Sequence, residues 1–182
     1  ESVVASLEDF YLEPEERLAR GLRWRAVPGS HDLSVLSVFL KEIDRVPPEE
    51  FTVPRFSMAK DRRLPPTRAP AGIDCVVFEG WFVGGRVPGY ENLASRIDYP
   101  IYLDAPQASL REWRMQREQQ LRVDGLGGYS EAQMRLFWDE VLSPGIVAWV
   151  EPIRPIADLI FTYDAQHRPV TMQYQSMVRE RQ

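Results

Sequence analysis

Hydrophobic and polar residues repeat along this chain with two different periods. Short apolar runs of high β propensity occupy residues 2–6, 73–80, 97–105 and 157–164, and another at 169–175 follows the turn-rich segment DAQHRP. Apolar residues recur with the helical period over residues 32–46, 106–122 and 130–151. Because strands alternate with helices, we predict an α/β fold with a mostly parallel sheet flanked by helices, ending in a hairpin.

Two segments have no apolar period. Residues 21–32 and 53–72 are rich in proline, glycine and arginine, and we expect both to be ordered binding loops. The third helical segment begins after Ser130, a suitable N-cap, and we expect Pro144-Gly145 to kink or split it.

Composition narrows the class of protein. The chain has 182 residues, 44% of them hydrophobic, and we assign it to one domain, residues 1–182. A net charge of −5 gives no basic field for nucleic acid or an anionic membrane, and no apolar run is long enough to span a bilayer. The single cysteine, Cys75, lies in an apolar run and is expected to be a buried structural thiol. We therefore expect a soluble, cytoplasmic protein.

Carboxylates follow three of the predicted strands. Glu8 and Asp9 follow the first strand, Glu79 ends the second, and Asp104 ends the third. Parallel strands place their carboxyl ends at one edge of a sheet, where such acids can hold hydrated Mg²⁺ or accept a hydroxyl proton. Each acid could equally be a solvated polar cap.

The helical segment 106–122 carries a ridge of arginines. Residues 111, 114 and 117 are spaced by three, and a further arginine stands at position 122. Guanidinium groups in such a ridge can clamp phosphoryl oxygens. The period alone favours a solvated surface helix with intrahelical ion pairs.

Six segments, taken in order, resemble the P-loop small-molecule kinases and among them most closely the D-glycerate 3-kinase group. They are SLEDFYL, RAVPGSHD, VPRFSMAKDRR, VVFEGWFVG, WRMQREQQLR and DAQHRPV. Their counterparts in that group include S-x-D-D-F-Y, G-V-P-G-T-H-D, F-E-G-W and the lid motif W-R-x-Q-x-E-x-x-L-R. The resemblance spans nearly the whole chain and implies a P-loop kinase-like fold.

The resemblance also implies roles for individual residues. The first acid of the signature is the general base, which places Glu8 in that role with Asp9 beside it, and the choice between the two stays open because glutamate reaches one methylene further. The residues that the resemblance implies as contacts of the acceptor are Tyr11, His31, Asp32, Arg55, Lys60 and Arg62. Glu79 is implied to bind Mg²⁺ through water. Residues 106–129 are implied to form a lid that binds phosphate through Arg114, Arg117 and Arg122. His31 could instead be a structural loop histidine, and the basic segment a solvated loop; Met58 also stands where the group has a lysine.

The phosphate-binding motif G-x-x-x-x-G-K-[ST] does not occur in the chain, and neither Lys41 nor Lys60 has the required neighbours. We expect a fragment or truncated gene product that lacks the first strand and phosphate loop and is inactive by itself. The alternative is a natural relative that binds a small ligand or a partner without phosphoryl transfer. Loss of a central strand would expose an apolar edge, so we also expect aggregation or self-association through that edge.

The resemblance thus implies phosphoryl transfer from ATP, with Mg²⁺, to a hydroxyl of a small hydroxy acid such as D-glycerate. A kinase of the same superfamily acting on a nucleoside or a pantothenate-like alcohol is the alternative enzyme.

Overall fold

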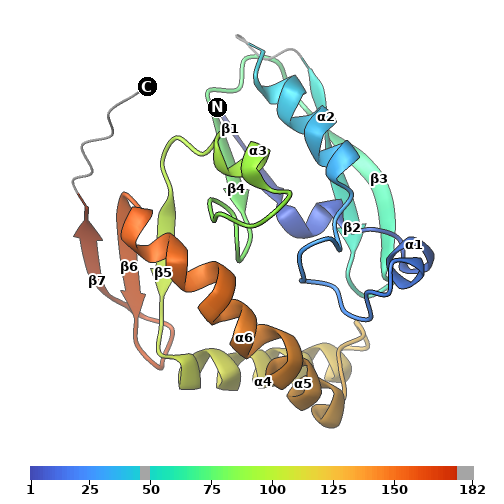
Figure 1. The fold of residues 1–182 in the computed structure, drawn as a ribbon, viewed down its shortest axis with the longest axis vertical. Helices are drawn as coiled ribbons and strands as arrows, with labels where there is room; N and C mark the ends of the chain where they lie inside the picture. The colour runs from blue at the N-terminus through green and yellow to red at the C-terminus, as the bar shows by residue number, and fades with distance from the viewer. Residues whose placement is uncertain (46–49, 176–182) are drawn as a thin grey trace. The chain divides into compact units, whose positions relative to one another are not determined.

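The computed structural model describes residues 1–45 and 50–175, which belong to two compact units (Figure 1). The first unit comprises residues 1–83 and 87–94, and the second comprises residues 84–86 and the chain from residue 95 onward. The first unit contains two two-stranded sheets and the second a three-stranded sheet, and each unit has its own buried side chains.

The first unit contains a parallel strand pair. Strand β1 (Ser2–Ser6) pairs with β4 (Cys75–Glu79) from Ser2 opposite Cys75 to Ser6 opposite Glu79. Side chains alternate between the two faces, so Ala5 and Phe78 face the core while Val4 and Val77 on the other face are exposed. Cys75 lies on the exposed face with Val77, which corrects the expectation of a buried thiol.

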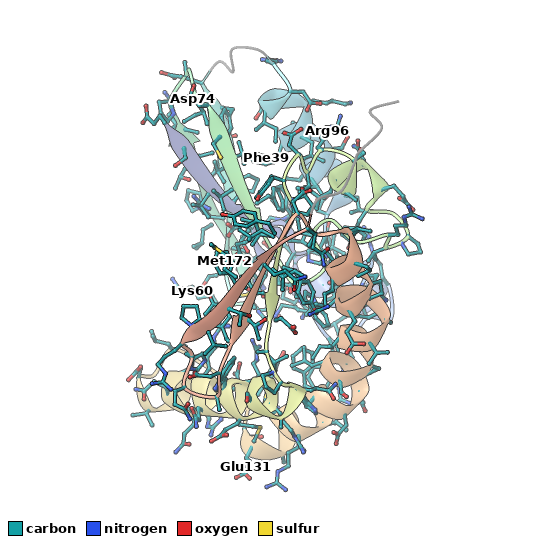
Figure 2. The ribbon with its side chains drawn as sticks, turned by 90° about the vertical axis from the view of Figure 1, so that its left-hand side faces the viewer. Phe39, Lys60, Asp74, Arg96, Glu131 and Met172 are labelled. Carbon is teal, nitrogen blue, oxygen red and sulfur yellow. The ribbon has the colours of Figure 1, made fainter. Side chains whose placement is uncertain are left out.

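The core of the first unit is aromatic. The 3₁₀ turn η1 (Leu7–Phe10) directly follows β1, and helix α2 (Leu33–Ile43) packs beside it. Phe10, Phe39 and Phe78 pack together with ring centroids 5.4–6.0 Å apart, and only Phe10 and Phe78 are stacked; Phe39 is labelled in Figure 2. Asp32 caps α2, since its side chain accepts hydrogen bonds from the backbone N–H groups of Ser34 and Val35.

The segment expected to be a long binding loop is a β-hairpin. Strand β2 (Phe51–Ser57) pairs antiparallel with β3 (Arg62–Ala69), with an irregularity between Val53 and Arg55. Prolines 54, 65 and 66 hide the strand pattern, but a two-stranded hairpin tolerates them at a bulge and along an unpaired edge. Short helices α1 (Pro14–Ala19) and α3 (Glu91–Ala94) complete the unit.

The second unit contains a three-stranded mixed sheet. Strand β5 (Ile101–Asp104) pairs parallel with β6 (Leu159–Tyr163), and β6 pairs antiparallel with β7 (Pro169–Tyr174), which is the predicted hairpin. One face is covered by a cluster of Tyr102, Ile153, Ala157 and Ile160.

Helices α4 (Gln107–Val123) and α5 (Glu131–Phe137) follow β5. Ser130 and Gln133 form a capping box at the start of α5, as the N-cap pattern predicts. Beyond α5 the chain stays helical. A π-helical turn at 138–142 leads into α6 (Ser143–Gly145), and a second π-helical turn at 146–150 leads into a 3₁₀ helix at 151–156. The expected interruption of the helix at Pro144-Gly145 is therefore seen as these two wider π-helical turns.

The α/β class and the parallel pairing are confirmed. The parallel strands form two separate pairs, β1–β4 and β5–β6, and the antiparallel strands β2, β3 and β7 are additional. Within residues 1–45 and 50–175, no helix combines the length and the apolar character that a membrane span requires.

Candidate active site

The strand-end acids of the first unit lie on η1 and at the end of β4. Leu7 and Phe10 are buried on one side of η1, which leaves Glu8 and Asp9 between them only half-buried. The Ser6 hydroxyl accepts a hydrogen bond from the Glu8 backbone N–H at 3.2 Å and caps the turn. Because Ser6 pairs with Glu79, the parallel register places Glu79 beside the end of β1, where η1 begins.

Gly80 allows the chain to pack closely at the end of β4. A Cβ atom at position 80 would lie 2.8 Å from Leu7 Cβ and 2.8 Å from Val83 Cγ2, closer than side chains approach one another. The glycine after Glu79 therefore lets the end of β4 pack directly against η1. The F-E-G-W segment signals this close approach in the sequence.

Asp9 is bound on both oxygens. Its Oδ2 accepts a hydrogen bond from Arg55 Nη1 at 2.9 Å, and its Oδ1 accepts one from the Phe56 backbone N–H at 2.9 Å. Arg55, expected to bind a substrate carboxylate, thus neutralises Asp9 and also donates to Thr67 Oγ1. The Asp9 carboxylate attaches η1 to the β2–β3 hairpin.

His31 lies in a buried aromatic cluster. The imidazole is only 1% exposed and stacks on the Tyr11 ring at 4.5 Å with an interplanar angle of 20°. Its Nδ1 is 2.7 Å from the hydroxyl of Tyr90, a residue for which the sequence suggested no role. Burial lowers the pKa of His31 to about 3, so the ring is neutral at physiological pH. The structure thus brings together His31 and Tyr11, two of the expected substrate contacts.

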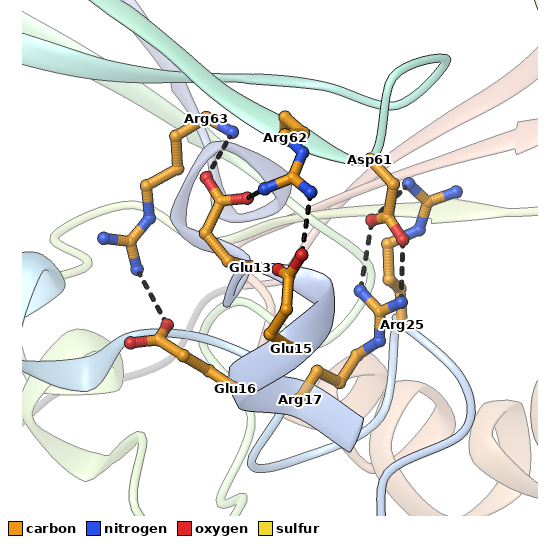
Figure 3. A network of polar contacts seen from close by, with 8 residues as sticks. All are labelled: Glu13, Glu15, Glu16, Arg17, Arg25, Asp61, Arg62 and Arg63. Carbon is orange, nitrogen blue, oxygen red and sulfur yellow. Dashed lines mark hydrogen bonds and ion pairs between the residues drawn. The ribbon is translucent and has the colours of Figure 1, made fainter. Parts of the chain in front are cut away.

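An ion-pair network connects the hairpin turn to α1 and to the loop before α2 (Figure 3). Asp61 receives two hydrogen bonds from Arg17, at 2.7 and 3.1 Å, and one from Arg25 at 3.1 Å. Burial disfavours the Asp61 carboxylate, but the hydrogen bonds and charges of the two arginines outweigh it and lower its pKa. This bridge lies at the left-handed turn of the hairpin, where Asp61 has φ = 50°.

Two expected substrate contacts belong to the same network. Arg62 pairs with Glu15 at 2.7 Å and Glu13 at 3.4 Å, and Asp32 pairs with Arg63 at 2.7 Å. Lys60, labelled in Figure 2, is exposed, and no ion pair of its ammonium group lies within the described part of the chain. Lys60 is therefore more accessible to an anion than Arg62.

The arginines of α4 differ in their environments. Arg114 pairs at 3.1 Å with the buried carboxylate of Glu118, which also accepts the Tyr129 backbone N–H, and Arg122 donates to the Tyr129 carbonyl. Arg117 is exposed and has no ion pair among residues 1–45 and 50–175. Of Arg114, Arg117 and Arg122, Arg117 is therefore the one whose guanidinium group has no polar partner in the part of the chain that the structure describes.

The β6–β7 turn anchors α4. Trp113 stacks on His167 with ring centroids 3.7 Å apart, and its indole N–H donates to the Ala165 carbonyl at 3.1 Å. Arg168 closes the turn through Asp164. The DAQHRPV segment thus positions the helix that carries the arginine ridge.

Within the described residues, no three His, Cys, Asp or Glu side chains gather closely enough to hold a metal ion. The 182-residue chain also lacks the G-x-x-x-x-G-K-[ST] loop whose backbone N–H groups would cradle phosphates. Glu79 as a magnesium ligand therefore remains a prediction that needs further ligands.

Comparisons with known proteins found a similar sequence and similar folds among kinases. No family model matches the chain. A pantothenate kinase from Streptomyces coelicolor is 26% identical over 191 residues, which cover 91% of this chain and 56% of that protein, so the chain spans little more than half the length of this relative.

Two solved structures have the same fold. A D-glycerate 3-kinase from Cryptococcus neoformans var. grubii superposes with a TM-score of 0.75 at 19% identity, covering 96% of this chain and 80% of the kinase. The protein YGR205w superposes with a TM-score of 0.73 at 19% identity, covering 97% of this chain and 78% of that one. The chain therefore has a P-loop kinase-like α/β fold, and the resemblance read from its sequence is confirmed.

Proposed function

We propose that the chain is the acceptor-binding and lid portion of an ATP-dependent kinase that phosphorylates a hydroxyl of a small hydroxy acid such as D-glycerate. The observation that carries this proposal is the placement of Glu8 and Glu79 at one carboxyl edge of a parallel strand pair. The fold similarity to a D-glycerate 3-kinase supports the same acceptor class.

We assign the role of proton acceptor to Glu8, because it is the first acid of the segment that resembles S-x-D-D-F-Y. Both Asp9 oxygens already accept hydrogen bonds, from Arg55 and from the Phe56 backbone, so the Asp9 carboxylate holds the hairpin against η1. In the proposed reaction Glu8 accepts the hydroxyl proton as the substrate oxygen bonds to the γ-phosphorus of ATP, and the bond from that phosphorus to the bridging oxygen breaks to release ADP. Arg117 and Lys60 are accessible cations for phosphate and carboxylate oxygens.

Kinetics of two isosteric variants test this assignment in the enzyme expressed from its complete reading frame. We expect Glu8→Gln to lower kcat by about 100-fold with little change in KM, because only proton transfer is lost. Asp9→Asn should mainly lower stability, since it weakens the contact with Arg55. A kcat loss confined to Asp9→Asn would reverse the assignment.

A second acceptor class has its own support. The sequence match to a pantothenate kinase favours a pantothenate-like alcohol over glycerate. ATP turnover measured with D-glycerate, pantothenate and uridine separates the candidates. Turnover with D-glycerate supports the main proposal, whereas turnover with pantothenate or uridine alone overturns the glycerate assignment. Binding of an acceptor without turnover of any of the three indicates a non-catalytic binding protein.

A further inference from the structure

Helix α4, which belongs to the predicted lid, buries one carboxylate. The side chain of Glu118 is 5% exposed, whereas Glu112, the other acidic residue of the helix, is exposed. The sequence suggested no role for Glu118. A buried charge is costly unless it is paired and hydrogen-bonded, so the partners of Glu118 indicate what this carboxylate does in the fold.

Both oxygens of Glu118 have a partner. Its Oε1 pairs at 3.1 Å with Nη2 of Arg114, which lies one turn earlier on α4. Its Oε2 accepts the backbone N–H of Tyr129 at 2.9 Å, and Tyr129 directly precedes Ser130, the N-cap of α5. One carboxylate thus joins an arginine of α4 to the connection that leads into α5.

The connection between α4 and α5 folds back along α4. The helix ends in a Schellman motif, in which the Leu126 N–H donates to the Leu121 carbonyl at 2.9 Å. Gly128 has φ = 99°, and a Cβ atom at this position would lie 2.8 Å from the carbonyl oxygen of Glu118. The backbone of the connection therefore passes directly against α4 at the residue whose carboxylate binds it.

Tyr129 is held through both of its backbone polar groups. Its N–H donates to Glu118, its carbonyl accepts a hydrogen bond from Arg122, and its ring packs 5.4 Å from that of Phe137 on α5. The side chain of Arg114 is 24% exposed, so the guanidinium group that Glu118 holds is still partly open to solvent. A change at Glu118 therefore affects both the connection and an arginine of the predicted lid.

We propose that Glu118 is a positioning residue of the predicted lid: its carboxylate fastens the α4–α5 connection to α4 and holds Arg114 in place for the phosphates of ATP. The inference rests on the proposed function, which supplies those phosphates. Glu118 touches neither substrate and acts through Arg114. Loss of its charge therefore weakens the binding of ATP and leaves the binding of the acceptor unchanged.

The two glutamates of α4 give a matched pair of variants for testing the attachment. Glu118→Gln removes the charge with little change in size, and Glu112→Gln makes the same change at an exposed position. Amide hydrogen exchange, followed by NMR of the enzyme expressed from its complete reading frame, reports on the Tyr129 N–H. We expect about tenfold faster exchange at Tyr129 in Glu118→Gln, because a carboxylate accepts a stronger hydrogen bond than an amide does, and native exchange in Glu112→Gln.

Steady-state kinetics of the same variants test the role in the lid. We expect Glu118→Gln to raise KM for ATP by roughly three- to tenfold, with an unchanged KM for the acceptor that the native enzyme uses, D-glycerate or pantothenate. A purely structural role would lower the amount of active enzyme, and hence kcat, without changing either KM. In an Arg114→Gln background, Glu118→Gln should have no further effect on KM for ATP, because the group that it positions is already absent.

Three results overturn the inference: Tyr129 exchange that is the same in Glu118→Gln as in the native enzyme, a KM for ATP that is unchanged or lower in a folded Glu118→Gln variant, or additive effects of Glu118→Gln and Arg114→Gln. If Glu118→Gln does not fold, Gly128→Ala replaces it. The added Cβ displaces the connection from the Glu118 carbonyl without altering a charge, and it should raise the same KM. Absence of ATP turnover in the native enzyme overturns the proposed function instead, and Tyr129 exchange then decides whether Glu118 fastens the connection.

Discussion

The imidazole of His31 links the site to the pH dependence of folding. Its pKa is about 3 in the folded chain, against about 6.5 when exposed in the unfolded chain. Below about pH 6.5 the unfolded state binds a proton that the folded state does not, so stability falls as pH falls. We expect the free energy of unfolding to decrease by about 2 kcal/mol from pH 7 to pH 5, measured by urea unfolding at each pH.

Variants of the two histidines separate this effect from other titrations. His167→Gln should keep the native pH dependence, whereas His31→Gln should flatten it between pH 7 and pH 5. The carboxylates whose pKa is lowered, such as Asp61 and Asp164, release their stabilisation at lower pH and lie outside this window. A slope that persists in a folded His31→Gln variant would contradict the buried neutral ring.

At the residue scale, the sequence predicted which residues belong to the candidate site better than it predicted the contacts that those residues make. The segment V-P-G-S-H-D marked His31 and Asp32, and S-L-E-D-F-Y marked Glu8 and Asp9. Neither pattern could indicate that Tyr90 closes over His31 or that Arg55 reaches Asp9, because those contacts join residues 59 and 46 positions apart. Residues distant in the sequence therefore determine whether a polar side chain is open to a ligand or is bound to another residue of the protein.

At the element scale, a largely buried ion-pair bridge at Asp61 stabilises the turn of the β2–β3 hairpin. Asp61 bridges Arg17, whose side chain is 7% exposed, and Arg25 at the hairpin turn. Asp61→Asn removes the charge and keeps a residue type that tolerates positive φ, so the ion pairs are lost without backbone strain. We expect urea unfolding to show a loss of about 3 kcal/mol, because two largely buried guanidinium groups lose their counter-ion.

Glu15→Gln is the matched control for this hairpin. Glu15 also pairs with an arginine of β3, Arg62, but both side chains are exposed, and solvent screens such pairs so that they contribute little to stability. Equal losses in the two variants would show that burial does not distinguish the two ion pairs. The comparison therefore tests whether the Asp61 bridge, rather than the whole charged network, attaches the hairpin.

The elements themselves were largely predictable from the sequence. Strands β1, β4, β5, β6 and β7 and helices α2 and α5 lie within the predicted segments, and α4 extends one residue beyond its segment, to Val123. The hairpin was missed because prolines and arginines interrupt its alternation, and because β3 is exposed along most of its length and so has little apolar period to detect. Local periodicity finds elements that bury a regular face, and it fails for those that do not.

At the scale of the whole molecule, the strand pairs leave edges open. Among the described strands, β4 pairs only with β1, and β5 pairs only with β6. The sequence predicted parallel strands but could not assign them to sheets, because pairing depends on contacts that periodicity does not encode. Both edge strands expose large apolar side chains, namely Val77 on β4 and Ile101 and Leu103 on β5.

Open parallel edges with apolar side chains favour pairing with another chain. We therefore expect the 182-residue chain to self-associate with rising concentration, measured by sedimentation velocity. Leu103 is 63% exposed, and Leu103→Lys should weaken the association because a charged edge residue opposes strand pairing. Val123→Lys is the matched control, since Val123 is 74% exposed but ends helix α4. Equal weakening by both variants would indicate general hydrophobic association, and a chain that stays monomeric at all concentrations would refute edge pairing.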